Sequence, residues 1–260
     1  MATLYLCGAG NPEGVRLALN INRAQSRWEH IVILDDDPSK HGQSILGVEI
    51  TGPFTVLERA DPASSEVANL VARTTRKRQS ALRKIQTYGL PFVPLIDPGV
   101  DMMGVDVGKD ITVYRGVLFC ANATVGEGSV IFAGAIVGHG CFLGRCCIVG
   151  PGAVINARVE LGDGVYVGTN ASILPDLKIG SWVTIGANSA AVQDVPAGAT
   201  VMGVPAQILM EGGQELNGES LDSLGKGQGD SKRTEIQSEA LRKLRIAQEK
   251  YIKVYRSKKT

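Results

Sequence analysis

The chain has 260 residues, of which 44% are hydrophobic, 5% are aromatic and 32 are glycine, and its formal net charge is +1. The length allows one large domain or two smaller ones, and the glycine-rich, aromatic-poor composition favours many short strands with tight turns over a helical bundle. The near-neutral charge argues against a whole-chain affinity for nucleic acid or for anionic membranes.

Neither a membrane span nor a signal peptide is expected. The sequence contains no apolar run long enough to cross a bilayer as a helix, and its start lacks a basic segment followed by an apolar one. The five cysteines are odd in number and lack metal-type spacing, so they are expected to be small buried hydrophobes in a reducing cytoplasm. They are Cys7, Cys120, Cys141, Cys146 and Cys147.

The first predicted elements are a strand, a glycine turn and a helix. Residues 3–7 form an apolar run that enters the turn GAGNPEG at 8–14, after which apolar residues recur at helical spacing from Val15 to Ala24. A second apolar run at 30–34 ends in three aspartates. This order is that of a nucleotide-binding βαβ unit, although the glycine spacing is G-x-G-x-x-x-G rather than the dinucleotide G-x-G-x-x-G. A βαβ unit without a ligand remains the alternative.

A strand over 48–51 and helical patterns over 54–59 and 76–88 extend this start into a small α/β domain, predicted over residues 1–98.

A six-residue period occupies the middle of the chain. Every sixth residue from Val107 to Ile185, fourteen positions in all, is large and apolar. With this composition, chance gives such a run in one register on the order of 10⁻⁵ of the time. Glycine often follows the apolar residue, and a small or aliphatic residue stands four positions after it.

That period has a geometric cause. A prism with three flat faces needs one strand and one corner per hexad, so the large aliphatic residue points inward and the small residue fits the crowded corner. Coils made of three hexads then stack by parallel strand pairing, and each coil buries its neighbour's face. The sequence therefore predicts a parallel β-helix, over residues 99–210.

The chain is predicted to end in a linker and a helix. Residues 211–231 are rich in glycine, serine and polar residues and indicate a flexible linker. Residues 232–259 contain ten Lys/Arg and three Glu, with apolar residues at helical spacing, which predicts a basic amphipathic helix over 232–260. This helix packs on its own trimer or, as the alternative, binds a partner or a membrane surface.

With the hexads, the turn Gly8-Ala9-Gly10 and the segment MGVPA at 202–206, the chain resembles a family of bacterial sugar acetyltransferases. This family includes the UDP-amino-sugar N-acetyltransferases and the sialic-acid O-acetyltransferases, and the resemblance covers about residues 3–209. It implies a Rossmann-like domain for a nucleotide sugar and a left-handed β-helix that forms a homotrimer. It also implies acetyl-CoA in the cleft between adjacent β-helices, a histidine base, no metal and a cytoplasmic role in polysaccharide biosynthesis.

Three histidines are present, and His139 alone lies in the repeats, at the place of the family's base. Its position two residues after the inward Val137 aims it outward. Acyl transfer from a thioester to an amine or hydroxyl needs a base with a pKa near the working pH, which an imidazole provides.

The resemblance also assigns binding groups, mostly on the main chain. Ala157 is stacked one coil over His139, and its N–H is the candidate donor to the oxyanion. Residues that match acetyl-CoA contacts are Ile148, Thr169 and Ala187. Residues at the positions of nucleotide-sugar contacts are Gly10, Asn11, Pro12, Asp35, Asp36, Thr74 and Thr75, and the helix that opens near Pro12 can present N–H groups to a diphosphate.

The chain departs from the family's pattern at four places, the first of which is Gly10-Asn11-Pro12 in place of a Ser-Gly-His type turn. Gly138 and Gly140 flank the base where a carboxylate is usual, Phe132 replaces a polar residue, and Ile148 replaces a histidine found in some members. These departures leave open the acceptor, the choice between N- and O-transfer, and the group that orients His139.

Two other functions remain as alternatives. A serine O-acetyltransferase shares only the repeats, and the βαβ start weighs against it. A non-catalytic trimeric binding scaffold fits the missing carboxylates but not the retained base. A β-helix carbonic anhydrase is excluded because it needs three metal-binding histidines.

Overall fold

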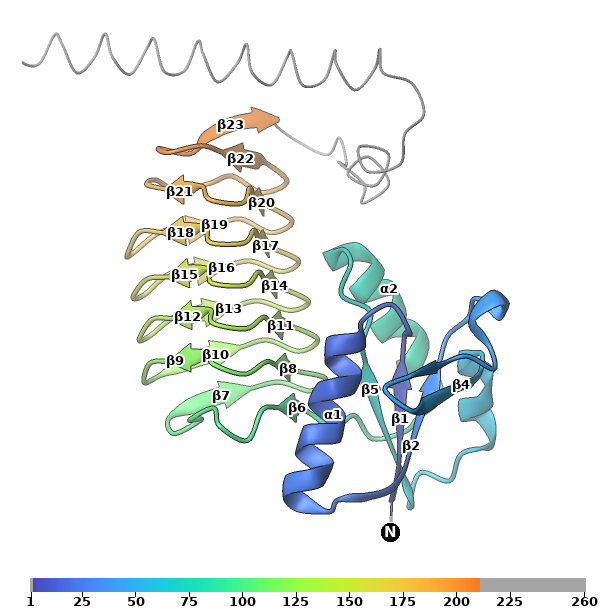
Figure 1. Cartoon of the computed structure of the whole chain (residues 1–260). Helices are drawn as coiled ribbons and strands as arrows, with labels where there is room; N and C mark the ends of the chain where they lie inside the picture. Colours follow the sequence, from blue (N-terminus) through green and yellow to red (C-terminus); the bar gives the residue numbers. More distant parts are fainter. Residues whose placement is uncertain (1, 211–260) are drawn as a thin grey trace, which may run out of the picture.

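The computed structural model describes residues 2–210, which fold into an α/β unit packed against a β-helix (Figure 1). The predicted linker over 211–231 and the predicted basic helix over 232–260 lie outside the described residues. No helix within the described part of the chain is long and apolar enough to cross a membrane.

The α/β unit is built on a five-stranded sheet of order β3-β4-β2-β1-β5. Neighbouring strands are parallel except for β3, which pairs antiparallel with β4. The strands are β1 (Ala2–Cys7), β2 (Trp28–Leu34), β3 (Ser44–Ile45), β4 (Val48–Gly52) and β5 (Ser65–Asn69). The predicted strands at 3–7, 30–34 and 48–51 correspond to β1, β2 and β4.

Helix α1 (Pro12–Gln25) follows β1, and α2 (Thr75–Gln86) follows β5. The Asn11 side chain caps α1 by accepting a hydrogen bond from Gly14 N–H, and proline at the first helical position suits the missing donor there. The stretch predicted as a helix over 54–59 is a 3₁₀ helix, η2 (Phe54–Arg59), as is η1 (Pro38–Lys40). The short segment between Pro53 and Ala60 has too few residues for a stable α-helix.

The β-helix has three sheets of parallel strands, and each strand pairs with the strand one coil away, as Thr124 pairs with Phe142 and Phe142 with Glu160. One sheet contains β7 (Val105–Val107), β10 (Ala123–Val125), β13 (Phe142–Leu143), β16 (Glu160–Leu161) and β19 (Lys178–Ile179). A second contains β9 (Leu118–Phe119), β12 (Ile136–Val137), β15 (Val154–Ile155), β18 (Ser172–Ile173) and β21 (Ala190–Ala191). The third begins with β6 (Leu95–Ile96) and β8 (Thr112–Val113), then β11 (Val130–Ile131), β14 (Ile148–Val149), β17 (Tyr166–Val167) and β20 (Thr184–Ile185).

The predicted hexads form the core of this β-helix. The large aliphatic residues, from Val113 to Ile185, point inward and are packed with the small corner residues, such as Ala135 and Cys141, in one cluster. Phe119 is only partly buried against this cluster, and Val107 is 36% exposed because β7 is the last strand of its sheet. The repeats and their parallel sheets fit a left-handed β-helix.

An antiparallel hairpin closes the last coil. Strand β22 (Thr200–Met202) continues the third sheet beside β20, and β23 (Gln207–Met210) turns back along it through the segment MGVPA. The Val204–Pro205 peptide bond in this turn is cis.

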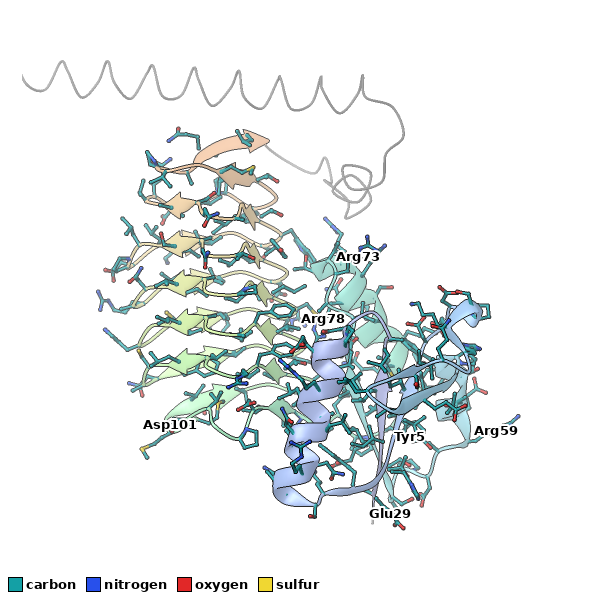
Figure 2. The ribbon with its side chains drawn as sticks, in the orientation of Figure 1. Tyr5, Glu29, Arg59, Arg73, Arg78 and Asp101 are labelled. Atoms are coloured by element: carbon teal, nitrogen blue, oxygen red, sulfur yellow. The ribbon has the colours of Figure 1, made fainter. Side chains whose placement is uncertain are left out.

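The α/β unit lies against the third sheet, on the side of β8 and β11 (Figure 1). Tyr114 and Val130 of the β-helix belong to the same buried cluster as Val15 and Ile21 of α1. Arg78 of α2 lies between the two units (Figure 2). This shared packing fixes the position of the α/β unit relative to the repeats.

Candidate active site

His139 lies at the corner that follows β12, on the outside of the β-helix. Val137 is fully buried in the core, whereas two residues later His139 is exposed, as its place in the hexad predicts. Within residues 2–210 no hydrogen bond is made by the imidazole, so both ring nitrogens are free for a ligand or a partner.

The glycine before His139 is required by the stacking of the coils. A Cβ atom on Gly138 would lie 2.6 Å from the backbone nitrogen of Ala157, closer than real Cβ contacts allow. A carboxylate at position 138 therefore cannot accompany this coil geometry. Gly140 has φ +65°, a left-handed conformation that glycine adopts without strain.

A carboxylate does face this corner from two coils further along. Asp176 accepts hydrogen bonds from Arg158 Nε at 2.6 Å and from the terminal nitrogen of Arg158 at 2.8 Å. The backbone N–H of Arg158 in turn donates to the carbonyl of His139 at 2.9 Å. The hydrogen bond from Arg158 holds the pKa of Asp176 below its usual value, with a smaller contribution from His139. This pair was not predicted from the sequence. The signal was present, because Arg158 and Asp176 are one whole coil apart and so are stacked on each other.

The backbone donors at the corners are not equally used. Within residues 2–210 the amides of Ala157, Thr169 and Ala187 donate no hydrogen bond, since each stands at the corner position between two paired residues. At the third corner, side chains cap the equivalent amides: Arg145 N–H donates to Asp163 Oδ1 at 2.8 Å, and Asp163 N–H donates to Ser181 Oγ at 3.1 Å. Two edges of the prism therefore present free donors.

The three residues matched to acetyl-CoA are not all at one place. Thr169 and Ala187 are exposed and occupy the same corner, one coil apart. Ile148 lies on β14 in the sheet that faces the α/β unit, and it is only 1% exposed. The structure therefore does not bring the Ile148 side chain to the exposed corner that Thr169 and Ala187 share.

Both aspartates matched to the nucleotide sugar are engaged within the α/β unit. Asp35 accepts hydrogen bonds from Ala9 N–H at 2.7 Å, Asp37 N–H at 2.9 Å and Lys40 Nζ at 2.9 Å. Burial opposes the charge, but these donors together keep the pKa of Asp35 below its usual value. Asp36 accepts hydrogen bonds from Phe54 N–H and Lys84 Nζ. These contacts order the loop after β2 beside the turn after β1.

The remaining matched residues stand at the starts of the two helices. Gly10, Asn11 and Pro12 open α1, while Thr74 caps α2 by accepting a hydrogen bond from Lys77 N–H at 3.1 Å and Thr75 is buried. The chain runs from β1 to β2 on one side of β1, whereas β5 lies on the other side of β1. The turns after β1 and β5 therefore lie at the switch point of the sheet, where the strand order reverses.

Asn11 and Phe132 take part in the joint between the units. Asn11 Nδ2 donates to the phenol oxygen of Tyr114 at 2.7 Å. The Tyr114 ring stacks on Phe132 with centroids 5.0 Å apart and an interplanar angle of 2°. The departure from the family's polar residue at Phe132 thus has a packing role in this chain.

The sequence matches the bacterial transferase hexapeptide (six repeats) family over residues 158–190. The structure is similar to that of a variant of perosamine N-acetyltransferase from Caulobacter crescentus in complex with CoA and GDP-perosamine. The identity is 27% and the TM-score 0.72, over 81% of this chain and 98% of that one. It is also similar to the acetyltransferase domain of PglB from Neisseria gonorrhoeae in complex with acetyl coenzyme A. There the identity is 26% and the TM-score 0.73, over 80% and 98% of the two chains.

WeeI from Acinetobacter baumannii shares the fold, with 20% identity and a TM-score of 0.72 over 80% of this chain and 100% of that one. No curated protein sequence matches the chain.

The chain is an acyltransferase, and its repeats resemble those of the hexapeptide transferases. The predicted resemblance to the bacterial sugar acetyltransferases is confirmed, since the solved relatives above 25% identity match nearly their whole length to residues of both units.

In this acyltransferase the two edges with free backbone amides border the same sheet of the β-helix. The sheet β9-β12-β15-β18-β21 has the Thr169–Ala187 corner at its start and the His139–Ala157 corner at its end. The hexad from one corner to the next spans at most about 20 Å. Within one chain, His139 and the Thr169–Ala187 corner are therefore held apart by the width of a face.

Proposed function

We propose that the chain is an acetyl-CoA-dependent acetyltransferase that acts on an amino sugar linked to a nucleotide, with His139 as the general base. The proposal is supported by the relatives in complex with CoA and GDP-perosamine and with acetyl coenzyme A. The observation that carries it is the pairing of a free, exposed imidazole at His139 with the unused N–H of Ala157 in the coil stacked on it.

These two groups would divide the chemistry of one transfer. The imidazole of His139 takes a proton from the attacking amine while the amine nitrogen bonds to the thioester carbonyl carbon. The Ala157 N–H donates to the carbonyl oxygen as negative charge develops there. When the carbon–sulfur bond breaks, the imidazolium returns the proton to the departing CoA thiolate, so that CoA thiol and the N-acetyl product leave the site.

A homotrimer would complete this site. Leu118 is 53% exposed and Ile136 is 37% exposed on the outer surface of the face that separates the two open edges. Large exposed apolar side chains in one sheet favour a protein interface. A cyclic arrangement through this face would place the His139 edge of one copy against the Thr169–Ala187 edge of the next, because a cyclic contact joins two different surfaces.

We propose that the α/β unit of this acetyltransferase holds the nucleotide, as a Rossmann-like domain over residues 1–98 beside the β-helix over 99–210. The turns after β1 and β5 lie at the switch point, where open α/β sheets bind their ligands. The first turn of α1 would offer N–H groups to the diphosphate.

The test compares His139→Gln with the wild-type protein, with GDP-perosamine as acceptor and CoA release as the readout. We expect the variant to lose about 10²- to 10⁴-fold in kcat while its oligomeric state is unchanged. His30→Gln is the matched control, because His30 is exposed on β2 far from the repeats, and it should keep full activity. Full activity in His139→Gln would exclude the proposed base.

A further inference from the structure

Three buried side chains inside the β-helix donate hydrogen bonds to the backbone of the next coil. Each occupies the small corner position of its hexad, is at most 1% exposed, and donates to a carbonyl fifteen residues later. The bonds run from Ser129 Oγ to Gly144 at 3.0 Å, from Cys141 Sγ to Asn156 at 2.9 Å and from Cys147 Sγ to Gly162 at 3.2 Å. Each bond therefore acts on a peptide group at the corner of the coil above.

The bond from Cys141 falls on the peptide group between Asn156 and Ala157. The other end of that group is the Ala157 N–H, which donates no hydrogen bond within residues 2–210 and is the proposed donor to the oxyanion. The next coil holds the same segment, because Asn156 Nδ2 donates to the carbonyl of Ile173 at 2.7 Å and Asp176 N–H donates to the carbonyl of Ala157 at 3.0 Å. The peptide is thus fixed from both sides while its N–H stays open.

The bond from Cys147 lies at the third edge and provides a comparison. The Gly162 carbonyl belongs to the peptide whose N–H is that of Asp163, and this N–H donates to Ser181 Oγ at 3.1 Å. The donor of that peptide is therefore already used inside the protein. Ser129 makes the same kind of bond at this edge with a hydroxyl group, so both a thiol and a hydroxyl fit the corner position.

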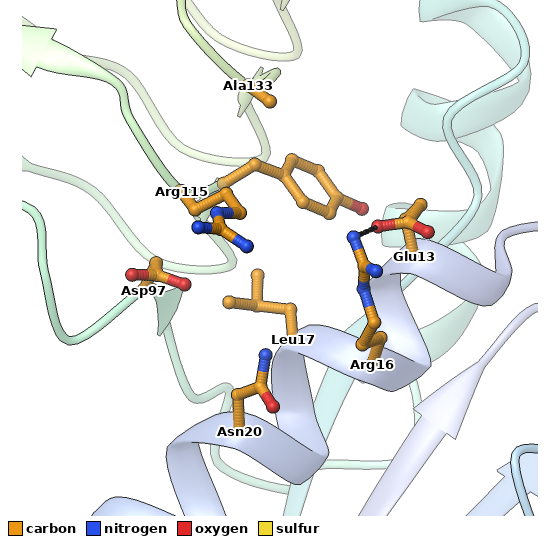
Figure 3. Close-up of a pocket in the computed structure, with 8 residues that line it drawn as sticks. Glu13, Arg16, Leu17, Asn20, Asp97, Arg115 and Ala133 are labelled. Atoms are coloured by element: carbon orange, nitrogen blue, oxygen red, sulfur yellow. Dashed lines mark hydrogen bonds and ion pairs between the residues drawn. The ribbon is translucent and has the colours of Figure 1, made fainter.

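The other edge with free amides has no such side-chain donor. Figure 3 shows the beginning of this edge beside α1, where Ala133 lies one coil after Arg115. Further along, the small corner residues that precede the free amides by one coil are alanines, whose side chains donate no hydrogen bond. They are Ala153 and Ala171. Among the corners of the described chain, the one contacted by Cys141 combines a side-chain donor on its carbonyl with a free N–H.

We infer that Cys141 is a positioning residue of the acetyltransferase, which orients and polarises the Asn156–Ala157 peptide so that its N–H becomes a stronger donor to the oxyanion. A carbonyl that accepts a hydrogen bond draws electron density from its own N–H, and hydrogen bonds in a chain strengthen one another. A donor that is fixed before the reaction needs no reorganisation when charge develops. Burial raises the pKa of the Cys141 thiol, so at neutral pH the thiol keeps the proton that it donates. This inference rests on the proposed function, because it acts through the Ala157 amide.

The kinetic test compares Cys141→Ala and Cys141→Ser with the wild-type protein, with the acceptor and the CoA readout of the His139→Gln experiment. Cys141→Ala removes the donor and should lower kcat by about two- to tenfold, the range of one neutral hydrogen bond, while KM for acetyl-CoA stays within about twofold. Cys141→Ser should recover most of the wild-type kcat, because the hydroxyl of Ser129 reaches the equivalent carbonyl. Cys147→Ala is the matched control and should keep the wild-type kcat, since it affects a peptide whose N–H is capped.

A second measurement does not depend on transfer. Labelling with ¹³C-carbonyl asparagine and ¹⁵N-alanine selects the three Asn–Ala peptides of the chain in a nuclear magnetic resonance spectrum. We expect the amide nitrogen signal of Ala157 to move upfield in Cys141→Ala, because its carbonyl no longer accepts a hydrogen bond. The signal should return toward its wild-type position in Cys141→Ser and stay unchanged in Cys147→Ala. The Asn170–Ala171 peptide is the internal reference.

An unchanged Ala157 nitrogen signal in Cys141→Ala would overturn the inference. Equal kcat values in Cys141→Ala and Cys147→Ala would also overturn it, provided that Ala157→Pro, which removes the amide hydrogen itself, has lost activity. If the nitrogen signal moves but Ala157→Pro remains fully active, the proposed oxyanion donor fails, whereas the contact of Cys141 with its peptide stands.

Discussion

The guanidinium of Arg78 on α2 lies 3.3 Å from the carboxylate of Asp110 in the turn before β8, and both side chains are at most 1% exposed. Asp110 also accepts a hydrogen bond from Asn69 N–H at 2.9 Å. The same guanidinium donates to four backbone carbonyls of both units, those of Asn69, Val71, Asp110 and Gly128. One buried cation therefore joins the α/β unit to the β-helix.

Replacing Arg78 with methionine should destabilise the protein by about 3–5 kcal/mol, because the substitution leaves Asp110 as an uncompensated buried charge. Urea unfolding followed by circular dichroism at fixed protein concentration measures the change. Arg83→Met, on the exposed face of the same helix, should stay within about 0.5 kcal/mol of the wild-type protein. A loss below about 1 kcal/mol in Arg78→Met would show that the pair does not hold the two units together.

The stability contributed by Asp110 should decrease with rising pH. Burial raises the pKa of Asp110 to about 6, and the Arg78 charge only partly opposes it. Between about pH 4 and pH 6 the folded state thus keeps a proton that the unfolded chain has lost. The contribution is full below about pH 4 and is lost as pH rises through 6.

Asp110→Asn isolates this effect, since the carboxylates with lowered pKa values, such as Asp35 and Asp163, act in the opposite direction and are present in both proteins. The free energy of unfolding of the wild-type protein minus that of the variant should fall across this pH interval. A flat or rising difference would contradict the assignment.

Ala157→Pro removes the proposed oxyanion donor while keeping a residue that the corner accepts. Pro175 already stands at the same corner position one coil later, so the backbone is compatible with proline there. The loss of one preorganised donor should lower kcat by about 10²- to 10³-fold. Ala121→Pro, one coil before His139 at the same corner, is the control and should retain activity. Equal rates for Ala157→Pro and Ala121→Pro would exclude the Ala157 amide from the reaction.

If the proposed trimer forms, Ile136→Asp should convert it into monomers, because the substitution places a charge in the middle of the exposed apolar face of β12. Light scattering coupled to size-exclusion chromatography measures the mass. Thr124→Asp, on the adjacent sheet, should remain trimeric. If the site is shared between copies, the Ile136→Asp monomer should also lose acetyl transfer despite an intact His139.

The sequence was sufficient to predict the β-helix because its signal is periodic and global. Every sixth residue from Val113 onward must fill the same core, so the pattern repeats until it is unmistakable, and the predicted inward positions are confirmed by burial. The exposure of His139 follows from the same register. Shorter patterns predicted β1, β2, β4, α1 and α2 of the α/β unit, but they did not predict β3 or β5, and the stretch at 54–59 is a 3₁₀ helix.

The contacts between the units could not be read from the sequence. Asn11 stands at the position of a ligand contact, yet its side chain is held by Tyr114, which is 103 residues away and has no local pattern linking it to α1. Ile148 matched a coenzyme contact, but its side chain is only 1% exposed, on the sheet that faces the α/β unit. Arg78 and Asp110 had no motif at all, since each became a buried ion only through the docking of the two units.

The free amides of Thr169 and Ala187 stand on successive coils, so they belong to a row of backbone hydrogen-bond donors along one edge, with a spacing of about 4.8 Å. A ligand arm with carbonyl groups along its length can accept one hydrogen bond from each of these amides. The reach of the arm that the protein accommodates is then set by the number of coils. A single capping side chain, such as Asp163 at the third edge, occupies one of these backbone donors without changing the fold.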